Sequence, residues 1–222
     1  MDPATRFGEL INRPQPEAHL DLLVALVGAS FDRRAGVDDV LRELDRLAQR
    51  CPATFEGIVD TLFGSGLLKG NGREYSDPRN SYLHEVLRRG LGLPITLSVI
   101  AIEIGRRRDV PIVGVGLPSH FVIGLDGSER FADPFNGGLL YDPPQLTAVW
   151  QQITGSPASL SPAMLTATPA RSVVLRILNN LKQTFVHRDD HASLGVLAGL
   201  RGAFPELAHE HAEHARWMRH WN

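Results

Sequence analysis

The sequence predicts an α+β fold in which one buried helix packs on a small antiparallel sheet. Residues 95–104 place apolar side chains on nearly every side of a helix, so this helix should be buried on most sides. Short stretches rich in valine and isoleucine follow at 111–117 and 120–125, and a turn is expected at 126–128. Because these strands follow helices without alternating with them, the pattern is typical of an α+β fold.

The composition is that of an ordinary globular domain. The chain has 222 residues, a net charge of −2, 43% hydrophobic and 22% charged residues. A pI near 6.5 argues against a nucleic-acid partner, and no apolar run reaches the roughly 20 residues that span a bilayer. The N-terminus lacks a secretion signal, and the single cysteine, Cys51, excludes an internal disulfide. We expect a cytoplasmic protein without a cofactor, a nucleic-acid partner or a membrane partner, and its oligomeric state stays open.

The chain divides into an N-terminal helical segment (1–79), a core (80–141), a proline-rich connection (142–171) and a short C-terminal helical appendage (172–222). In the first segment, apolar residues between 37 and 48 recur at helical spacing. A second helix is expected over 55–63, ending at Gly64. In the last segment, residues 173–186 have one apolar helix face, which indicates a helix packed on the rest of the protein.

Four histidines gather near the C-terminus. His211 and His214 share a helix face at a spacing that suits metal chelation. However, His209-Glu210 is followed by Glu213 where a zinc-protease motif needs histidine. We interpret this region as a solvated helix face and predict no metal site.

Two polar residues stand out in the strand region, His120 and Asp133. They lie 13 residues apart on stretches joined by a hairpin, which can bring them side by side. A histidine and the carboxylate that orients it are two of the three members of a nucleophilic triad. The alternative is that His120 only ends a strand and that Asp133 belongs to an Asp-Pro turn. Spacing alone leaves both interpretations open.

These residues resemble the core of the transglutaminase-like superfamily, whose fold is papain-like. The resemblance is carried by Gly92-Leu93-Pro94, the buried helix, Asp109-Val110-Pro111, His120 and Asp133-Pro134. In that superfamily a catalytic cysteine begins the buried helix, and a histidine and an aspartate on strands complete the triad. The family's spacing, counted back from Pro111, puts the cysteine position at Pro94. The resemblance thus implies a retained His120–Asp133 pair beside a nucleophile position that holds proline.

Further stretches resemble the SirB-type branch of that superfamily, which lacks the catalytic cysteine. They are Leu44–Ala48, Asn80–Leu83, Arg88–Ser98, Pro118–Phe121, Asp133–Gly138 and Leu178–Lys182. Taken in order, they cover about residues 18–200. Longer members of the branch continue into a helical, repeat-like region, which is reduced here to a few helices.

Proline at position 94 suits the first turn of a helix but removes the attacking atom. The backbone N–H groups of Ile95 and Thr96 still point to the same spot, at the positive end of the helix dipole. We expect a polar cleft there that binds a carboxylate, an amide or a phosphate. The expected catalytic-type pair is His120 and Asp133, and the expected binding residues are Asn80, Pro94, Ile95, Thr96 and Pro118.

Other side chains are poorly placed to replace the nucleophile. Thr96 lies about 200° around the helix from Pro94, and Ser98 lies one turn deeper. Ser119 is expected on a strand with its side chain on the face opposite to His120. Cys51 is expected to be a small buried apolar residue.

Three hypotheses about function follow. The leading one is a catalytically silent transglutaminase-like domain that binds a protein or peptide partner or acts in regulation. The second is an amide hydrolase or acyl transferase of the same fold that uses His120 and Asp133 with a water or another nucleophile. The third is an interaction protein that works through its C-terminal helices.

Overall fold

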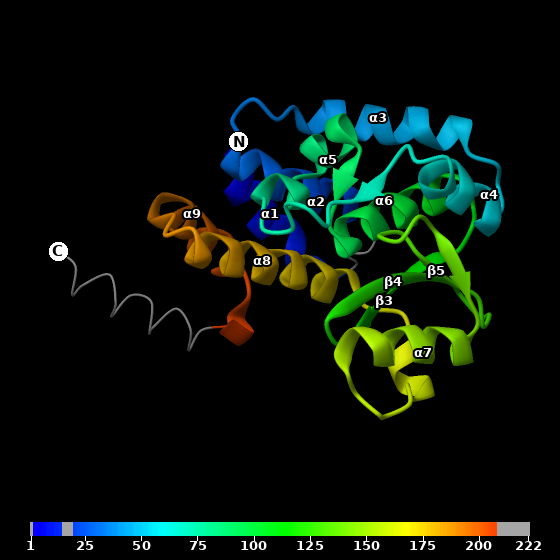
Figure 1. The fold of residues 1–222 in the computed structure, drawn as a ribbon. Coiled ribbons are helices and arrows are strands. Elements are labelled where there is room, and N and C mark those ends of the chain that lie inside the picture. The colour runs from blue at the N-terminus through cyan, green and yellow to red at the C-terminus, as the bar shows by residue number, and fades with distance from the viewer. Residues whose placement is uncertain (1, 15–19, 208–222) are drawn as a thin grey trace.

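A layer of helices lies on one face of a small antiparallel sheet, and helix α7 (Pro143–Thr154) covers the other face (Figure 1). This computed structural model describes residues 2–14 and 20–207. The predicted α+β fold, with a buried helix on a small antiparallel sheet, is confirmed.

The helices precede, follow and cover the sheet. In the first half they are α1 (Pro3–Ile11), α2 (Leu20–Phe31), α3 (Val37–Arg50), α4 (Phe55–Val59) and α5 (Leu83–Arg89). In the second half they are α6 (Pro94–Arg107), α7, α8 (Ala170–His187) and α9 (His191–Arg201). Short 3-10 turns lie at Pro78–Ser81, Pro162–Leu165 and Pro205–Leu207.

The main sheet has the order β3-β4-β5-β6, and all its neighbouring strands are antiparallel. Its strands are β3 (Ile112–Leu117), β4 (His120–Leu125), β5 (Phe131–Asp133) and β6 (Leu139–Tyr141). A separate parallel pair joins β1 (Lys69–Gly70) to β2 (Leu91–Gly92), directly before α6. This pair anchors the chain that leads into the buried helix.

Helix α6 is the centre of the main core. Pro94 occupies its first turn, as the sequence predicts, and of its 14 residues only Ile102, Arg106 and Arg107 keep appreciable exposure. Gly105 allows a close approach to the start of β3, because a Cβ there would lie 2.7 Å from the carbonyl oxygen of Val110. Helix α6 is therefore packed on nearly all sides, and this packing fixes its N-terminal end relative to the sheet.

Two elements differ from the sequence prediction. The helix expected over 55–63 is α-helical only to Val59 and continues as a wider π-type turn to Gly64, in which Ser65 N donates to Asp60 O. The proline-rich connection contains α7. Asp142 and Gln145 form a capping box at its start, so the prolines at 143 and 144 begin a helix instead of preventing one.

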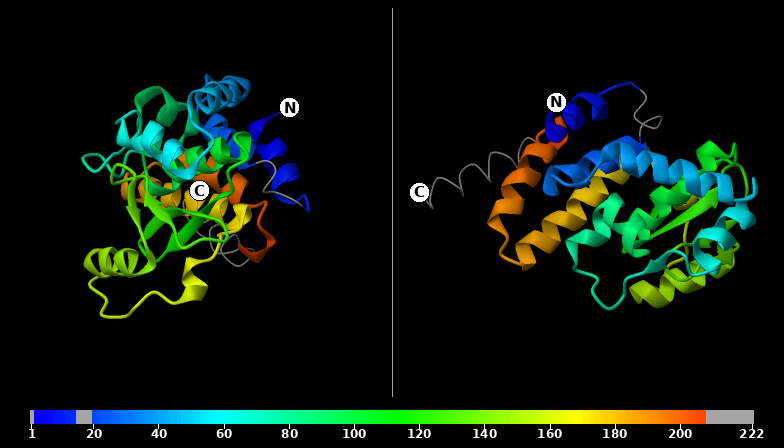
Figure 2. Two further views of the ribbon diagram at one scale, coloured as in Figure 1. Left: turned by 90° about the vertical axis from the view of Figure 1, so that its right-hand side faces the viewer. Right: turned by 90° about the horizontal axis from the view of Figure 1, so that it is seen from above.

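The two ends of the described chain pack together, as the views in Figure 2 show for α1 and α9. Asn12 Nδ2 donates to the carbonyl oxygen of Ala203 at 3.2 Å, and the Phe7 and Phe204 rings lie against each other. Helices α8 and α9 belong to the same hydrophobic core as α6. The C-terminal helices therefore continue into the core, and α8 can supply side chains to any site beside α6.

Candidate functional site

The predicted pair of His120 and Asp133 meets in the structure. The register pairs Ile123 with Ala132, so Asp133 lies diagonally across from His120 on the same face of the two strands. His120 Nε2 lies 2.8 Å from Asp133 Oδ2. His120 is only 6% exposed and Asp133 is fully buried. His120 does stand at the end of a strand and Asp133 does accept from the turn that follows it, but the two side chains are also in direct contact.

Asp133 is held as an anion by several donors. The backbone N–H groups of Phe135 and Asn136 donate to Oδ1, and the Asn136 amide donates to Oδ2 at 2.8 Å. Burial raises the pKa of Asp133, but the bonds from His120 and Asn136 outweigh it and leave the pKa below its usual value. An ionised Asp133 places the proton of a neutral His120 ring on Nε2. Nδ1 then makes no hydrogen bond to the residues described.

The N-terminal end of α6 lacks a side-chain cap. Leu93 precedes Pro94 and offers no capping bond. The N–H groups of Ile95 and Thr96 lie in the first turn, where no intrahelical acceptor exists. This end of the helix therefore keeps the positive partial charge that the sequence predicts.

A cleft of about 380 Å³ lies in front of this helix end. Pro94, Ile95, Ser119, His120 and Phe121 line one part of it, and Tyr75 comes from the loop before α5. Helix α8 supplies the rest of the lining with Arg176, Asn179, Asn180 and Gln183. The cleft thus joins Pro94 at the start of α6 to the buried histidine.

Arg176 is the most informative residue that sequence reasoning missed. Its Nη2 donates to the backbone carbonyl oxygens of Leu117 and His120, both at 2.7 Å, and the guanidinium lies over the Phe121 ring. Arg176 therefore holds both sides of the turn between β3 and β4. The sequence carries little signal for it, since this arginine lies outside the apolar face of the helix, as a solvent-facing residue would.

Comparison with known proteins agrees with this geometry. A family model described as the transglutaminase-like superfamily matches residues 17–179. The chain belongs to this family.

Its relatives place it in the SirB-type branch. A UPF0162 protein of Xylella fastidiosa (strain Temecula1) is 42% identical over 143 residues, which are 62% of this chain and 51% of the relative. The UPF0162 protein PA3419 of Pseudomonas aeruginosa is 28% identical over 185 residues, 83% of this chain and 60% of the relative. Protein SirB1 of Salmonella typhimurium is 28% identical over 134 residues, 58% of this chain and 49% of that protein. The chain thus spans about half to three fifths of the length of these relatives. No solved structure matches it significantly.

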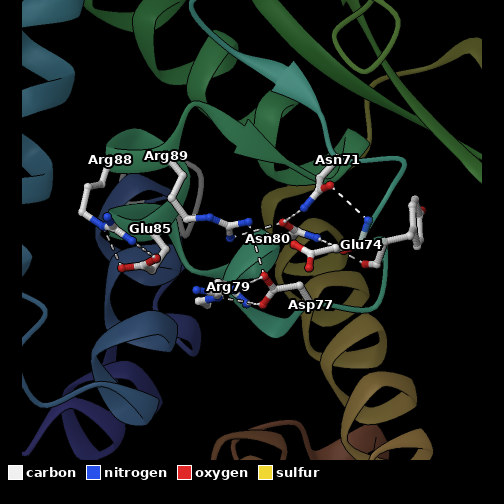
Figure 3. Close-up of polar contacts among 9 residues, drawn as sticks. Asn71, Glu74, Asp77, Arg79, Asn80, Glu85, Arg88 and Arg89 are labelled. Atoms are coloured by element: carbon white, nitrogen blue, oxygen red, sulfur yellow. Dashed lines mark hydrogen bonds and ion pairs between the residues drawn. The ribbon is translucent and has the colours of Figure 1, made fainter.

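Asn80, a predicted binding residue, lies outside the lining of the cleft. It is fully buried. Its amide donates to the carbonyl oxygen of Glu74 at 2.7 Å and accepts from Asn71 at 3.0 Å (Figure 3). Beside it, Asp77 is paired with Arg79 and Arg89. Asn80 Nδ2 also lies 3.3 Å from the carbonyl oxygen of Tyr75, so this network holds the loop that carries Tyr75 to the cleft.

Thr96 and Pro118, also predicted to bind, do not line the cleft either. Thr96 is fully buried, and its hydroxyl has no hydrogen-bond partner in the described chain. Pro118 is exposed, and its carbonyl oxygen accepts from Trp150 Nε1 at 3.1 Å. Of the predicted binding residues, only Pro94 and Ile95 therefore lie beside His120.

The candidate replacement nucleophiles take different places. Ser98 donates to the carbonyl oxygen of Pro94 at 2.8 Å and is buried. Cys51 is 2% exposed in the main core, as predicted. Ser119 does not lie on a strand: it sits in the two-residue turn between β3 and β4 with φ of 58°, because the hairpin pairs Leu117 with His120. It lines the cleft but makes no hydrogen bond to His120 in the structure described.

Within residues 2–14 and 20–207, no cluster of three histidine, cysteine, aspartate or glutamate side chains is arranged to hold a metal ion. The C-terminal histidines, including His211 and His214, fall outside the described residues. Among the helices described, none combines the length and apolar character needed to cross a bilayer.

Proposed function

We propose that the protein is a binding or regulatory module that engages a cytoplasmic protein or peptide through the cleft at Pro94, without transglutaminase or thiol-protease activity. The observation that carries this proposal is that Pro94 opens α6 in the same cleft that His120 lines. Covalent catalysis needs a nucleophile within hydrogen-bond reach of its base, and proline has no group that attacks.

The surroundings of Pro94 support this proposal. Ser98 is committed to a carbonyl oxygen of its own helix and Cys51 belongs to the core. Ser119 lies in the cleft but makes no hydrogen bond to the imidazole in the part of the chain described. The cleft offers N–H and guanidinium donors, which suit the binding of a polar or anionic group.

The direct test is an acyl-transfer and hydrolysis assay. The protein is incubated with glutaminyl peptides and primary amines, and release of ammonia and incorporation of amine are measured. We expect no turnover above buffer for the wild type or for His120→Ala. Turnover that disappears in His120→Ala would refute the proposal, because it would make the histidine a working base.

A second experiment tests whether Pro94 occupies the nucleophile position. Pro94→Cys places a thiol at the start of α6, where the helix dipole and His120 favour the thiolate. We expect iodoacetamide to label this thiol at least about tenfold faster than Cys51, whose pKa is raised by burial. Adding His120→Ala should slow the labelling. Equal labelling of the two cysteines would contradict the proposed position.

The alternative function is hydrolysis of an amide or ester by a water that His120 activates. The observation that favours it is the open Nδ1 of a histidine whose Nε2 is fixed by Asp133. Activity with ester substrates that persists in the wild type and is lost in both His120→Ala and Asp133→Asn would select this alternative. If none of the three proteins hydrolyses the substrates, the result favours the binding module.

A further inference from the structure

Arg176 carries a charge that no acidic side chain of the described residues balances. It is partly buried, and its printed bonds run from Nη2 to two carbonyl oxygens. Its Nε and Nη1 atoms make no hydrogen bond within the described chain. Burial lowers the pKa of Arg176, which reflects the cost of removing the cation from water. A partly buried cation without a counter-ion among the described residues is a candidate partner for an anion that these residues do not supply.

Other unused polar groups converge on the same cleft. His120 is 94% buried, yet its Nδ1 atom has no partner among the residues described. Asn180 lies one helical turn after Arg176 and lines the cleft, and its side chain makes no hydrogen bond in the described chain. The uncapped first turn of α6 adds its N–H groups. The guanidinium of Arg176, the Asn180 amide and the N–H groups of α6 can donate to a small anion, whereas Nδ1 of His120 donates only when the ring is protonated.

The cleft continues into a second hollow across Tyr75. Tyr75 lines both spaces, is 52% exposed and has its ring edge-on to Phe135. The second hollow measures about 790 Å³ and is lined by Arg73, Arg79 and Arg188. Its acidic side chains are Glu74 and Asp77, and Asp77 is already shared by Arg79 and Arg89. Positive charge therefore exceeds negative charge along this hollow.

We infer that the cleft binds the C-terminal carboxylate of an acidic peptide, whose preceding residues cross Tyr75 and lie along the hollow at Arg73 and Arg188. This inference rests on the proposed binding function and names its ligand class. The terminal carboxylate lies against Arg176 and the start of α6, and the acidic side chains meet the arginines of the second hollow. Exposed Tyr75 supplies an apolar surface for the chain between the two.

The charge pattern favours a chain end over a phosphate group. Both hydrogens of Arg176 Nη2 are taken by carbonyl oxygens, so a carboxylate at this site accepts a single charge-assisted hydrogen bond from Nε or Nη1. Inorganic phosphate would fill the cleft alone and gain nothing from the second hollow. A peptide that ends in the cleft uses both hollows at once, so it should bind far more tightly than either fragment.

The test is fluorescence anisotropy with three labelled octapeptides. One is glutamate-rich with a free C-terminus, the second is its C-terminal amide, and the third replaces glutamates by glutamines and keeps the free C-terminus. We expect amidation to weaken binding at least about tenfold, because the negative charge and its charge-assisted hydrogen bond to Arg176 are lost. The glutamine peptide should also bind more weakly, and the difference should shrink at high salt. Inorganic phosphate should compete poorly.

A matched pair of variants locates the site. Gln183→Glu adds a negative charge at the cleft, and Gln152→Glu adds the same charge on exposed α7, away from the cleft. We expect Gln183→Glu and Asn180→Asp to weaken the free-acid peptide several-fold or more, and Gln152→Glu to leave its binding unchanged. Arg176→Gln should abolish the preference for the free acid over the amide. A thermal melt checks that each variant is folded. The variants that add a charge at positions 152, 180 and 183 remove no side-chain contact on which the fold depends.

Each outcome decides. If the free acid and the amide bind the wild type equally well and both lose binding to Asn180→Asp, the inference of a carboxylate ligand is overturned. The proposed function of the cleft then remains intact. If Gln152→Glu weakens peptide binding as much as Gln183→Glu does, the site does not lie in the cleft. If inorganic phosphate competes as well as the peptide, the ligand is not a peptide C-terminus. If none of the peptides binds, the inference fails, while the proposed function is judged separately by the turnover assay.

Discussion

The two ends of helix α6 differ in whether the arginine beside them is paired with acidic side chains. At the C-terminal end, Arg107 contacts Asp21 at 2.7 Å, Glu103 at 2.8 Å and Asp45 at 2.7 Å. At the N-terminal end, Arg176 contacts only carbonyl oxygens and an aromatic ring among the described residues. Both arginines are at least partly buried. A cation surrounded by acids ties elements of the fold together, whereas a cation without an acid is available to a ligand.

The C-terminal end joins three helices. Asp21 comes from α2, Asp45 from α3, and Glu103 and Arg106 from α6 itself. Burial and the neighbouring Asp21 raise the pKa of Glu103 to about 7, although Arg106 and Arg107 act to lower it. One oxygen of Glu103 accepts from both arginines, and the other has no partner in the described chain. This cluster positions the three helices relative to one another.

The largest effect is expected when the charge balance at the C-terminal end is broken. Arg107→Ala leaves Asp21 and Glu103 buried with only Arg106 to offset them. We expect the free energy of unfolding to fall by about 3 kcal/mol in urea denaturation at pH 7. The control is Arg46→Ala, whose pairing with Glu43 is solvent-exposed and should matter by less than about 0.5 kcal/mol. Similar losses in both variants would contradict the contrast.

The pH dependence of stability should also identify the C-terminal end. A carboxyl group whose pKa is raised in the folded state contributes stability below its unfolded pKa, and this contribution is lost as the pH rises through the folded pKa. For Glu103 the window runs from 4.5 to about 7. Relative to Glu103→Gln, the wild type should lose about 2 to 3 kcal/mol across this window. A difference that stays constant from pH 4.5 to 8 in urea titrations would contradict the assigned cause.

At the N-terminal end, removing Asp133 should cost more than removing His120. Asp133→Ala leaves the Asn136 amide, two backbone N–H groups and the imidazole without their acceptor. We expect a loss of about 2 kcal/mol for Asp133→Ala and about 1 kcal/mol for His120→Ala, which leaves three donors on the carboxylate. Thermal melts of the two variants measure this order, and a reversed order would show that the carboxylate is not the centre of the network.

The smallest effect on stability is expected when an acidic side chain is introduced beside Arg176 at the N-terminal end of α6. Asn180→Asp places a carboxylate four residues after Arg176 on α8. Because the Asn180 side chain makes no hydrogen bond in the described chain, stability should stay unchanged or rise by no more than about 0.5 kcal/mol. A clear loss of stability in urea denaturation would mean that Asn180 has a structural role and that the two ends differ less than their contacts indicate.

Local patterns predicted most of the scaffold. The apolar stretch from 95 to 104 predicted α6, and the turn-separated strands predicted the hairpins that bring His120 to Asp133. They missed α7, because the prolines at 143 and 144 were read as a connection while the capping box at Asp142 makes them a helix start. The binding residues were predicted less well, since membership of a motif does not tell whether Asn80 points into the cleft or into the loop beside it.

The sequence by itself determined that residue 94 carries no attacking group, and it indicated that His120 and Asp133 can meet across a hairpin. These features depend on short connections and on residue identity, which local rules describe. Only the tertiary structure decided that Arg176 faces this pair, because α8 is about 50 residues further along the chain and its position depends on how the helices pack around α6. Packing also decided that Asn80 is turned inward and that Glu103 is buried among arginines.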